Sequence, residues 1–183
     1  MRRFLDRCSG RTLTLHVEPE MVYGKNRMGS FMLVDEQRDD AVGEVSFRIC
    51  QADSELSIQR IDVFGHSNAA DAHNPFPGVG RLLMYLACRH ASTMGLSTLR
   101  LVAKDSAIGF YTRMGLRADV HRPLPRMPAI QFVGNKLNRA WLDAFDDHFS
   151  MSRDIDEMTS EIFAVLSNIE GLVAAQWQEI TAA

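Results

Sequence analysis

The chain lacks the features that mark membrane proteins, secreted disulfide scaffolds and nucleic-acid binders. It has three widely spaced cysteines among 183 residues and no Cys-x-x-Cys pair or Cys/His cluster, so neither a zinc site nor a disulfide framework is predicted. No run approaches the ~18 apolar residues of a membrane span, and the first residues lack the apolar core of a signal peptide. The net charge of −3 leaves no basic surplus for a nucleic-acid partner. We therefore expect a cytoplasmic protein with reduced thiols.

The composition that is present is that of a folded, globular protein. Hydrophobic residues make up 46% of the chain and charged residues 23%, which are ordinary values for a folded domain. The length suits one domain, or one domain with an appendage. We found no internal repeat and no low-complexity tract.

The first third of the chain predicts an antiparallel meander of four strands. Residues 11–18 alternate polar and apolar side chains, and similar strand patterns follow at residues 30–35, 41–50 and 56–64. Residues 20–29 and two short polar runs read as the turns between these strands. The fourth strand has a phase error, because its apolar alternation changes face between Ile58 and Ile61. A β-bulge near Gln59 and Arg60 explains the change, as does a strand that is buried on both faces.

The middle of the chain predicts a strand–helix–strand unit. Apolar residues recur at helical spacing from Gly78 to Met94, and residues 98–103 follow as a fifth strand. A short helix begins at Asp105 or Ser106 and ends near Met114. This order indicates a parallel strand pair joined by a right-handed crossover, and hence a mixed α/β sheet.

The last third predicts one more strand and C-terminal helices. Residues 129–133 are apolar after a proline-rich loop, and residues 136–149 have a helical pattern. Residues 154–180 follow a near-heptad spacing over almost four repeats. A helix with this pattern packs on the core of its own chain or forms the seam of a dimer.

A glycine turn at residues 78–81 opens the first predicted helix directly after a loop. Free backbone N–H groups and the positive end of the helix dipole favour phosphate there. The alternative is a loop whose glycines serve only a positive φ. The sequence is not a Walker loop, because no Gly-Lys-Ser/Thr follows, and it lacks the third glycine of a dinucleotide fingerprint.

Tyr111, on a predicted helix about 30 residues after this turn, is a candidate proton donor to a leaving thiolate. Phe110, its neighbour, is the better candidate for the core, because adjacent helix residues face different directions. Candidate bases for an amine lie on or after the fourth strand, and each is equally a solvated surface residue: Glu55, Asp62, His66 and His73.

Two segments resemble the motifs of the GNAT superfamily of acyl-CoA N-acyltransferases. Residues 75–80 match the family's pyrophosphate loop at Gly78 and Gly80, with Pro75 at the usual basic or amide position. Residues 104–116 match the next family block at Ala107, Phe110, Tyr111 and Gly115, with Lys104 in place of asparagine. These matches cover about 60 residues. The family's two helices between its first and second strands have no counterpart in residues 19–29.

The resemblance implies a mixed, mostly antiparallel sheet with a splayed parallel central pair, plus C-terminal helices. It places an acyltransferase domain at residues 1–134 and a helical extension at residues 135–183. It implies acetyl-CoA as cofactor and direct attack by a primary amine on the thioester. Tyr111 would be the acid and Asp62 or His66 the base, while the N–H of Val63 or Phe64 polarises the carbonyl oxygen. The implied cofactor contacts are Val63, Phe64, Pro77, Gly78, Val79, Gly80, Arg81, Lys104, Ser106, Ala107 and Phe110.

Other functions stay open at this point. A degenerate fold that binds CoA, or nothing, and acts through its C-terminal helices is the main alternative, and the substituted motif positions favour it. The acceptor amine could also be carried by a protein or a tRNA, although the slight acidity gives no reason to choose a nucleic acid. A homodimer through the C-terminal helices is a further expectation.

Overall fold

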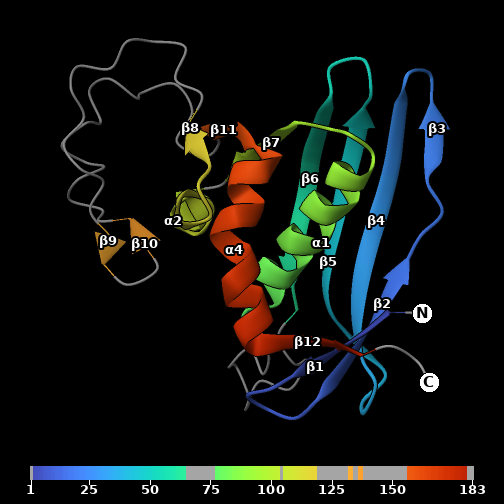
Figure 1. The fold of residues 1–183 in the computed structure, drawn as a ribbon, viewed down its shortest axis with the longest axis vertical. Coiled ribbons are helices and arrows are strands. Elements are labelled where there is room, and N and C mark those ends of the chain that lie inside the picture. Colours follow the sequence, from blue (N-terminus) through green and yellow to red (C-terminus); the bar gives the residue numbers. More distant parts are fainter. Residues whose placement is uncertain are drawn as a thin grey trace.

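A mixed α/β sheet dominates the computed structural model, which describes residues 2–64, 77–103, 105–118, 132–133, 136–137 and 156–180. Ten strands of the described part form one sheet in the order β12-β1-β2-β4-β5-β6-β7-β11-β8, with β3 paired to β4. One pair, β6 with β7, is parallel and the other pairs are antiparallel. Figure 1 shows α1 and α4 side by side on one face of this sheet. The predicted fold class is confirmed.

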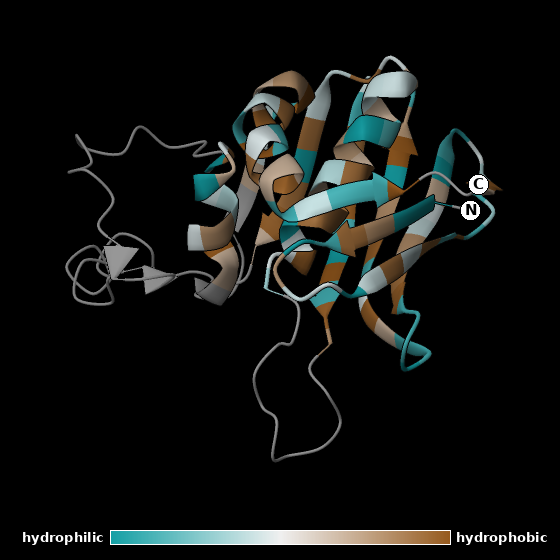
Figure 2. Cartoon of the chain, turned by 60° about the horizontal axis from the view of Figure 1, so that its bottom comes forward, coloured by the Kyte–Doolittle hydropathy of each residue, from teal (hydrophilic) through white to brown (hydrophobic). Residues whose placement is uncertain are grey.

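The antiparallel part of the sheet contains the predicted meander and two strands that the sequence did not indicate. Along the strands, hydrophilic and hydrophobic residues alternate (Figure 2). Two added strands are β1, which precedes the meander, and β3, which lies in a segment predicted as a turn. The strands of this part are β1 (Arg2–Asp6), β2 (Thr12–Val17), β3 (Met21–Tyr23), β4 (Asn26–Asp35), β5 (Asp40–Cys50) and β6 (Glu55–Val63).

The predicted bulge in β6 lies at Gln59. In the pairing with β5, Ser46 faces Arg60 and Phe47 faces Ile58, so Gln59 is the extra residue. The parallel pairing of β6 with β7 (Thr98–Ala103) also ends at Ile58, opposite Leu101. A bulge bends its strand and increases the local twist. Beyond Ile58, β6 therefore continues beside β5 while β7 continues beside β11, and the two central strands part.

Two helices flank the point where the central strands part. Helix α1 (Val79–Thr93) connects β6 to β7 and ends before Gly95, as predicted. Helix α2 (Asp105–Arg113) follows β7, and Gly115 lies just beyond it with φ 95°. Gly95 and Gly115 both have a positive φ, which residues other than glycine rarely adopt. The short strand β8 (Arg117–Ala118) comes next.

The prediction of an unbroken helix over residues 154–180 is wrong at both ends. Strand β11 (Asp156–Glu161) pairs with β7 and β8, and strand β12 (Trp177–Ile180) pairs with β1. Only α4 (Ile162–Gln176) is helical. The strands that pair with β11 and β12 are far away in sequence, and periodicity alone does not reveal such pairing. Residues 156–180 of the predicted extension therefore complete the same sheet and pack on the same core.

The remaining C-terminal predictions lie mostly outside the described residues. Strand β9 (Phe132–Val133) falls in the apolar segment predicted as a strand. It pairs with β10 (Lys136–Leu137), so the predicted helix over 136–149 is wrong at its first two residues. The rest of both segments, and the boundary proposed at residue 134, are not described. No helix in the described part is long and apolar enough to cross a membrane.

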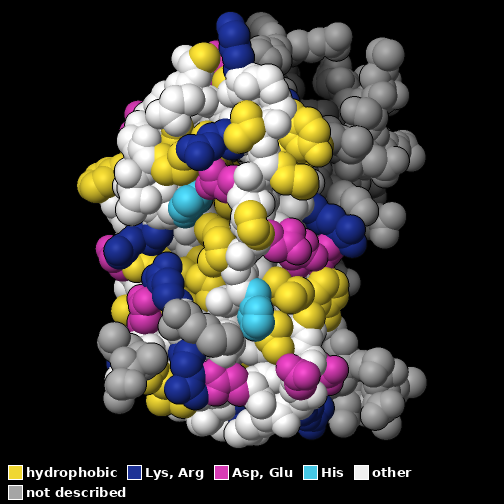
Figure 3. Space-filling model, turned by 90° about the vertical axis from the view of Figure 1, so that its right-hand side faces the viewer, with side chains coloured by type: hydrophobic (Ala, Val, Ile, Leu, Met, Phe, Trp, Pro, Cys, Tyr) yellow, Lys and Arg dark blue, Asp and Glu magenta, His cyan; other side chains and the backbone are white. Residues whose placement is uncertain are grey.

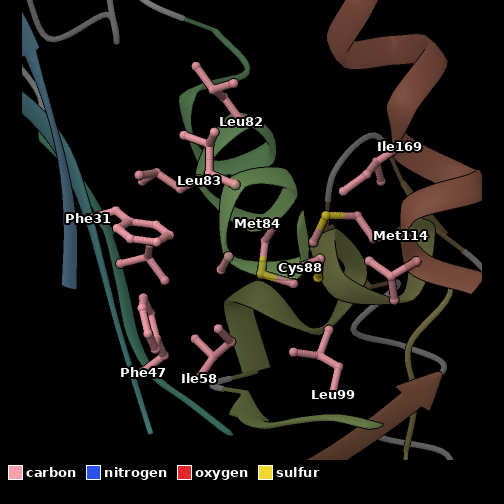
Figure 4. Packing of buried hydrophobic residues seen from close by; sticks show 14 of the residues in the cluster. Phe31, Phe47, Ile58, Leu82, Leu83, Met84, Cys88, Leu99, Met114 and Ile169 are labelled. Atoms are coloured by element: carbon pink, nitrogen blue, oxygen red, sulfur yellow. The ribbon is translucent and has the colours of Figure 1, made fainter. Parts of the chain in front are cut away.

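The core lies between the sheet and the two helices α1 and α4. Figure 3 views the edge of the sheet at β2 and β3, where charged side chains mix with exposed hydrophobic ones. Inside, Phe31 and Phe47 of the sheet face α1, and Met114 and Ile169 lie on its other side (Figure 4).

All three cysteines are free, and burial raises the pKa of the Cys88 thiol to about 12. Cys88 therefore acts as a packing residue.

Candidate functional site

A cleft of about 740 Å³ lies where the central strands part, between the end of β6, the start of α1, α2 and α4. Most of its wall is apolar, and backbone at two glycines also reaches it. Its lining residues are Ile61, Val63, Gly78, Gly80, Arg81, Ala107, Phe110, Tyr111, Arg113, Met114, Ile169 and Leu172. The cleft thus brings together the glycine turn and Tyr111, which the sequence had singled out separately.

The glycine turn opens α1 with its backbone amides uncapped. Gly78 is the N-cap residue with φ 93°, no side chain caps this end, and no acidic residue occupies the first turn. The first helical hydrogen bond is donated by Leu82 N to Gly78 O over 3.0 Å. The N–H groups of Val79, Gly80 and Arg81 precede this bond, so they have no acceptor within the helix. Together with the helix dipole they form an environment suited to an anion.

Gly80 marks the place where three elements converge. A Cβ atom built on Gly80 would lie 3.3 Å from Phe110 Cζ and 3.4 Å from Val63 Cγ2. The lack of a side chain therefore allows the start of α1 to lie close to both α2 and the end of β6. A ligand held at the turn is consequently within reach of the gap beside β6.

The two backbone donors proposed on β6 differ in their partners. The N–H of Phe64 donates to Val42 O over 3.0 Å, so it is already engaged with β5. Successive amides of an antiparallel strand alternate between its two edges. The N–H of Val63 therefore points to the opposite edge, toward the gap that β7 leaves. Of the two candidates, Val63 keeps the proposed role and Phe64 loses it.

Tyr111 is buried and Phe110 is half-buried, which reverses the predicted order. Tyr111 is 8% exposed and lines the cleft. Its ring contacts that of Phe110 edge-on with centroids 5.1 Å apart. Burial raises the pKa of the Tyr111 hydroxyl, and the negative charge of Asp62 raises it further. The phenol therefore keeps its proton at neutral pH. The prediction failed because the tilt of α2 against its neighbours decides which of two adjacent aromatic residues turns inward.

The proposed base Asp62 lies beside the cleft, outside its lining. Its carboxylate forms an ion pair with Arg60, two residues earlier on the same face of β6. Its charge still acts on Tyr111. The structure thus gives Asp62 an electrostatic effect on the phenol, while a role as base stays a prediction.

The remaining predicted contacts divide into placed and undescribed residues. Arg81 and Ala107 line the cleft, and Pro77 is exposed at the turn. Ser106 lies in the first turn of α2, and its side chain is not described. His66 and Lys104 lie outside the described residues, so their predicted roles stay untested. Glu55 is an ion-pair partner of Arg100 over 3.0 Å at the far end of β6.

Helix α4 supplies cleft residues that the sequence analysis missed. Ile169 and Leu172 line the cleft, and Ile169 points toward Met114 of the segment after α2 (Figure 4). The heptad pattern did contain these positions, but it offered only a core or a dimer seam as their destination. Four apolar residues of α4 are buried in the fold: Ile162, Val165, Ile169 and Val173.

A second, smaller hollow of about 370 Å³ lies between α1, β2 and β12. Leu15, Phe31 and Leu86 are among its apolar residues, and charged groups form its rim. Arg2 pairs with Glu179 through two contacts of 2.6 and 2.9 Å, and His90 Nε2 lies 2.8 Å from Glu20 Oε1. The charged side chains at the rim of this hollow are thus paired with groups of opposite charge.

Comparisons with known proteins find similarity in structure alone. No family model matches the chain, and no curated protein matches it. Nourseothricin acetyltransferase is 17% identical, with 88% of this chain and 98% of that chain covered and a TM-score of 0.47. An acetyltransferase of Bacillus subtilis in complex with CoA is 13% identical, with 81% and 98% covered and a TM-score of 0.47. Tetrahymena GCN5 is 16% identical, with 74% and 68% covered and a TM-score of 0.46. Values of this size do not by themselves assign the chain to a family.

Proposed function

We propose that this protein is an acyl-CoA N-acyltransferase of the GNAT type that transfers an acetyl group to a primary amine. One observation carries the proposal: the uncapped glycine turn, through Gly78, Gly80 and Arg81, and the buried phenol of Tyr111 line one cleft. That cleft begins where β6 and β7 part. The motif resemblance at residues 75–80 and 104–116 points to the same activity.

The residues of the cleft fit an acyl-CoA thioester along its length. The amides of Val79, Gly80 and Arg81 suit its diphosphate, and the guanidinium of Arg81 adds positive charge. The edge of β6 at Val63, which pairs with no described strand on the side of β7, suits the amide-bearing arm. Apolar side chains line the cleft around it. When bound, the thioester supplies an activated acyl group.

Backbone and side-chain groups of this protein serve the transfer in separate roles. The N–H of Val63 donates a hydrogen bond toward the position of the acyl oxygen, where negative charge develops. The amine nitrogen bonds to the acyl carbon and the carbon–sulfur bond breaks, while the protonated Tyr111 hydroxyl donates its proton to the leaving sulfur. The proton that the amine loses as the amide forms has Asp62 or His66 as its predicted acceptor. Burial and, to a smaller extent, the negative charge of Asp62 raise the pKa of this hydroxyl.

Binding and turnover experiments test the proposal directly. Calorimetric titration with acetyl-CoA should show saturable binding, and free thiol should appear when acetyl-CoA and a mixture of primary amines are supplied together. Omission of the amines gives the background rate of thioester hydrolysis. Binding without amine-dependent thiol release would favour the non-catalytic alternative, and a lack of binding at millimolar acetyl-CoA would reject the assignment.

A further inference from the structure

The two positive-φ glycines that bracket the cleft are each contacted by a side-chain amide of α4. Gln176 donates from Nε2 to Pro77 O, directly before Gly78, and Asn168 donates from Nδ2 to Met114 O over 3.3 Å, directly before Gly115. A Cβ atom on Gly78 would lie 2.4 Å from Gln176 Oε1, and one on Gly115 would lie 2.3 Å from Asn168 Nδ2. The same kind of contact thus occurs at the start of α1 and at the end of α2.

One face of α4 carries these two amides and the residues that line the cleft. Asn168, Leu172 and Gln176 are spaced four residues apart, so they lie along the same side of the helix. Leu172, between the two amides, is 52% exposed although it lines the cleft. The exposed half of its side chain offers an apolar surface at the cleft.

Both ends of α4 are anchored to the sheet. At its start, Ile162 N donates to Ser97 O over 2.8 Å. At its end, Gln176 O accepts from Arg7 N over 2.9 Å, and Trp177 is buried where β12 pairs with β1. The position of Leu172 relative to the glycine turn is therefore fixed by the fold on both sides.

We propose that α4 is the wall of the cleft that binds the nucleoside end of acyl-CoA, and that Gln176 and Asn168 are positioning residues for the two glycine turns. This inference rests on the proposed function. The turn faces β6 and α2 on its Gly80 side and α4 on its Gly78 side. The thioester end must face Val63 and Tyr111. The surface left for the adenine ring, which is flat and largely apolar, is that of Leu172, because Ile169 beside it is buried.

Calorimetry with two ligands tests the wall. The probes are CoA and 4′-phosphopantetheine, which lacks the nucleoside, and the variants are Leu172→Ser and the matched control Phe163→Ser. Phe163 is also on α4 and is 77% exposed, but it does not line the cleft. Leu172→Ser should raise the Kd of CoA roughly three- to tenfold and leave that of 4′-phosphopantetheine within about twofold. Phe163→Ser should change neither.

The outcomes separate this inference from the proposed function. Equal Kd values for CoA in the wild type and Leu172→Ser, or equal losses for both ligands, would overturn the wall and leave the proposed function intact. Wild-type protein that binds neither ligand would overturn both.

A second pair of variants tests the positioning role. Gln176→Leu removes the donor to Pro77 O, whereas Gln178→Leu changes an exposed glutamine on β12. Gln176→Leu should weaken inorganic pyrophosphate binding several-fold, while the thermal midpoints of the two variants stay alike. Unchanged pyrophosphate binding, or a loss that Gln178→Leu reproduces, would overturn the role of Gln176.

Discussion

The cleft beside β6 and the hollow beside β2 differ in how their polar groups are satisfied. In the cleft, three backbone amides at the start of α1 have no helical acceptor, and Tyr111 contributes its phenol to the wall. In the hollow, Arg2 pairs with Glu179, and His90 lies against Glu20. Arg89 donates to the Tyr85 hydroxyl over 3.0 Å.

This difference shows why cavity shape alone does not identify a site. A polar group that has no partner within the fold gains free energy when a ligand supplies that partner. Groups that already neutralise each other have little to offer a ligand.

The largest effect is expected for Tyr111→Phe compared with Tyr85→Phe. Loss of a general acid lowers the rate by roughly 10²- to 10⁴-fold, so kcat of Tyr111→Phe should fall by such a factor while KM for acetyl-CoA changes little. Tyr85→Phe removes a hydroxyl beside the hollow and should stay within about twofold of wild type. Steady-state thiol release across the pH range measures both. Equal rates for Tyr111→Phe and wild type at every pH would remove the acid role.

The second comparison uses two positive-φ glycines at opposite ends of α1. Gly78 has φ 93° and faces Gln176, whereas Gly95 has φ 75° and nothing within 4 Å of an added Cβ. Alanine should cost about 1–2 kcal/mol of stability at each position because of backbone strain. Gly78→Ala alone should weaken CoA binding, by about tenfold. Urea unfolding and calorimetry of the two variants measure these effects, and equal binding by both would contradict the site.

The third substitution, Glu179→Gln, should affect stability and leave the cleft unchanged. The hydrogen bonds from Arg2 hold the pKa of Glu179 below its ordinary value of 4.5. A carboxylate with a lowered folded pKa adds stability at neutral pH, and this stability is lost as the pH falls through that pKa. The pair is half-exposed, so wild type should exceed Glu179→Gln by at most about 1 kcal/mol at pH 7. Urea unfolding at pH 7 and pH 3 should show the difference vanish in acid, with the CoA Kd unaltered.

The smallest effect is expected for Asp62→Asn, which should lower the pKa of Tyr111. Removal of the negative charge eliminates the weaker of the two causes that raise this pKa, while burial continues to raise it. The Tyr111 signal is the tyrosinate absorbance of a protein minus that of the same protein with Tyr111→Phe added, measured for the wild type and for Asp62→Asn. An unchanged midpoint in Asp62→Asn would show that Asp62 does not act on the phenol.

Local sequence signals predicted the central features of the fold and the site. The phase error in residues 56–64 indicated either a bulge near Gln59 and Arg60 or a strand buried on both faces. The structure has the bulge at Gln59, and residues 55–58 before it are buried on both faces. Gly78 and Gly95 bracketed α1 because both adopt a positive φ that other residues disfavour. These features depend on neighbours within a few residues along the chain.

Features that depend on distant partners were missed or misread. The segment of β11 contains one apolar residue with a described side chain, Met158, and its helix-like spacing relative to later residues hid its pairing with β7. Strand β12 pairs with β1, about 175 residues earlier in the chain. The contacts of Gln176 and Asn168 with the glycine turns likewise bridge 99 and 54 residues. No local pattern encodes which of several candidate surfaces a helix will meet.

The pairing of β12 with β1 has a consequence for how the protein is made. A growing chain that has reached residue 118 already contains β6, α1, β7 and α2, but it lacks α4 and the strand that anchors it. Contacts of such long sequence separation form late, because their loop-closure entropy must be met first. Until residues 162–180 have been synthesised, the apolar surface between α1 and α2 stays uncovered. It is then a surface on which chaperones can act during translation.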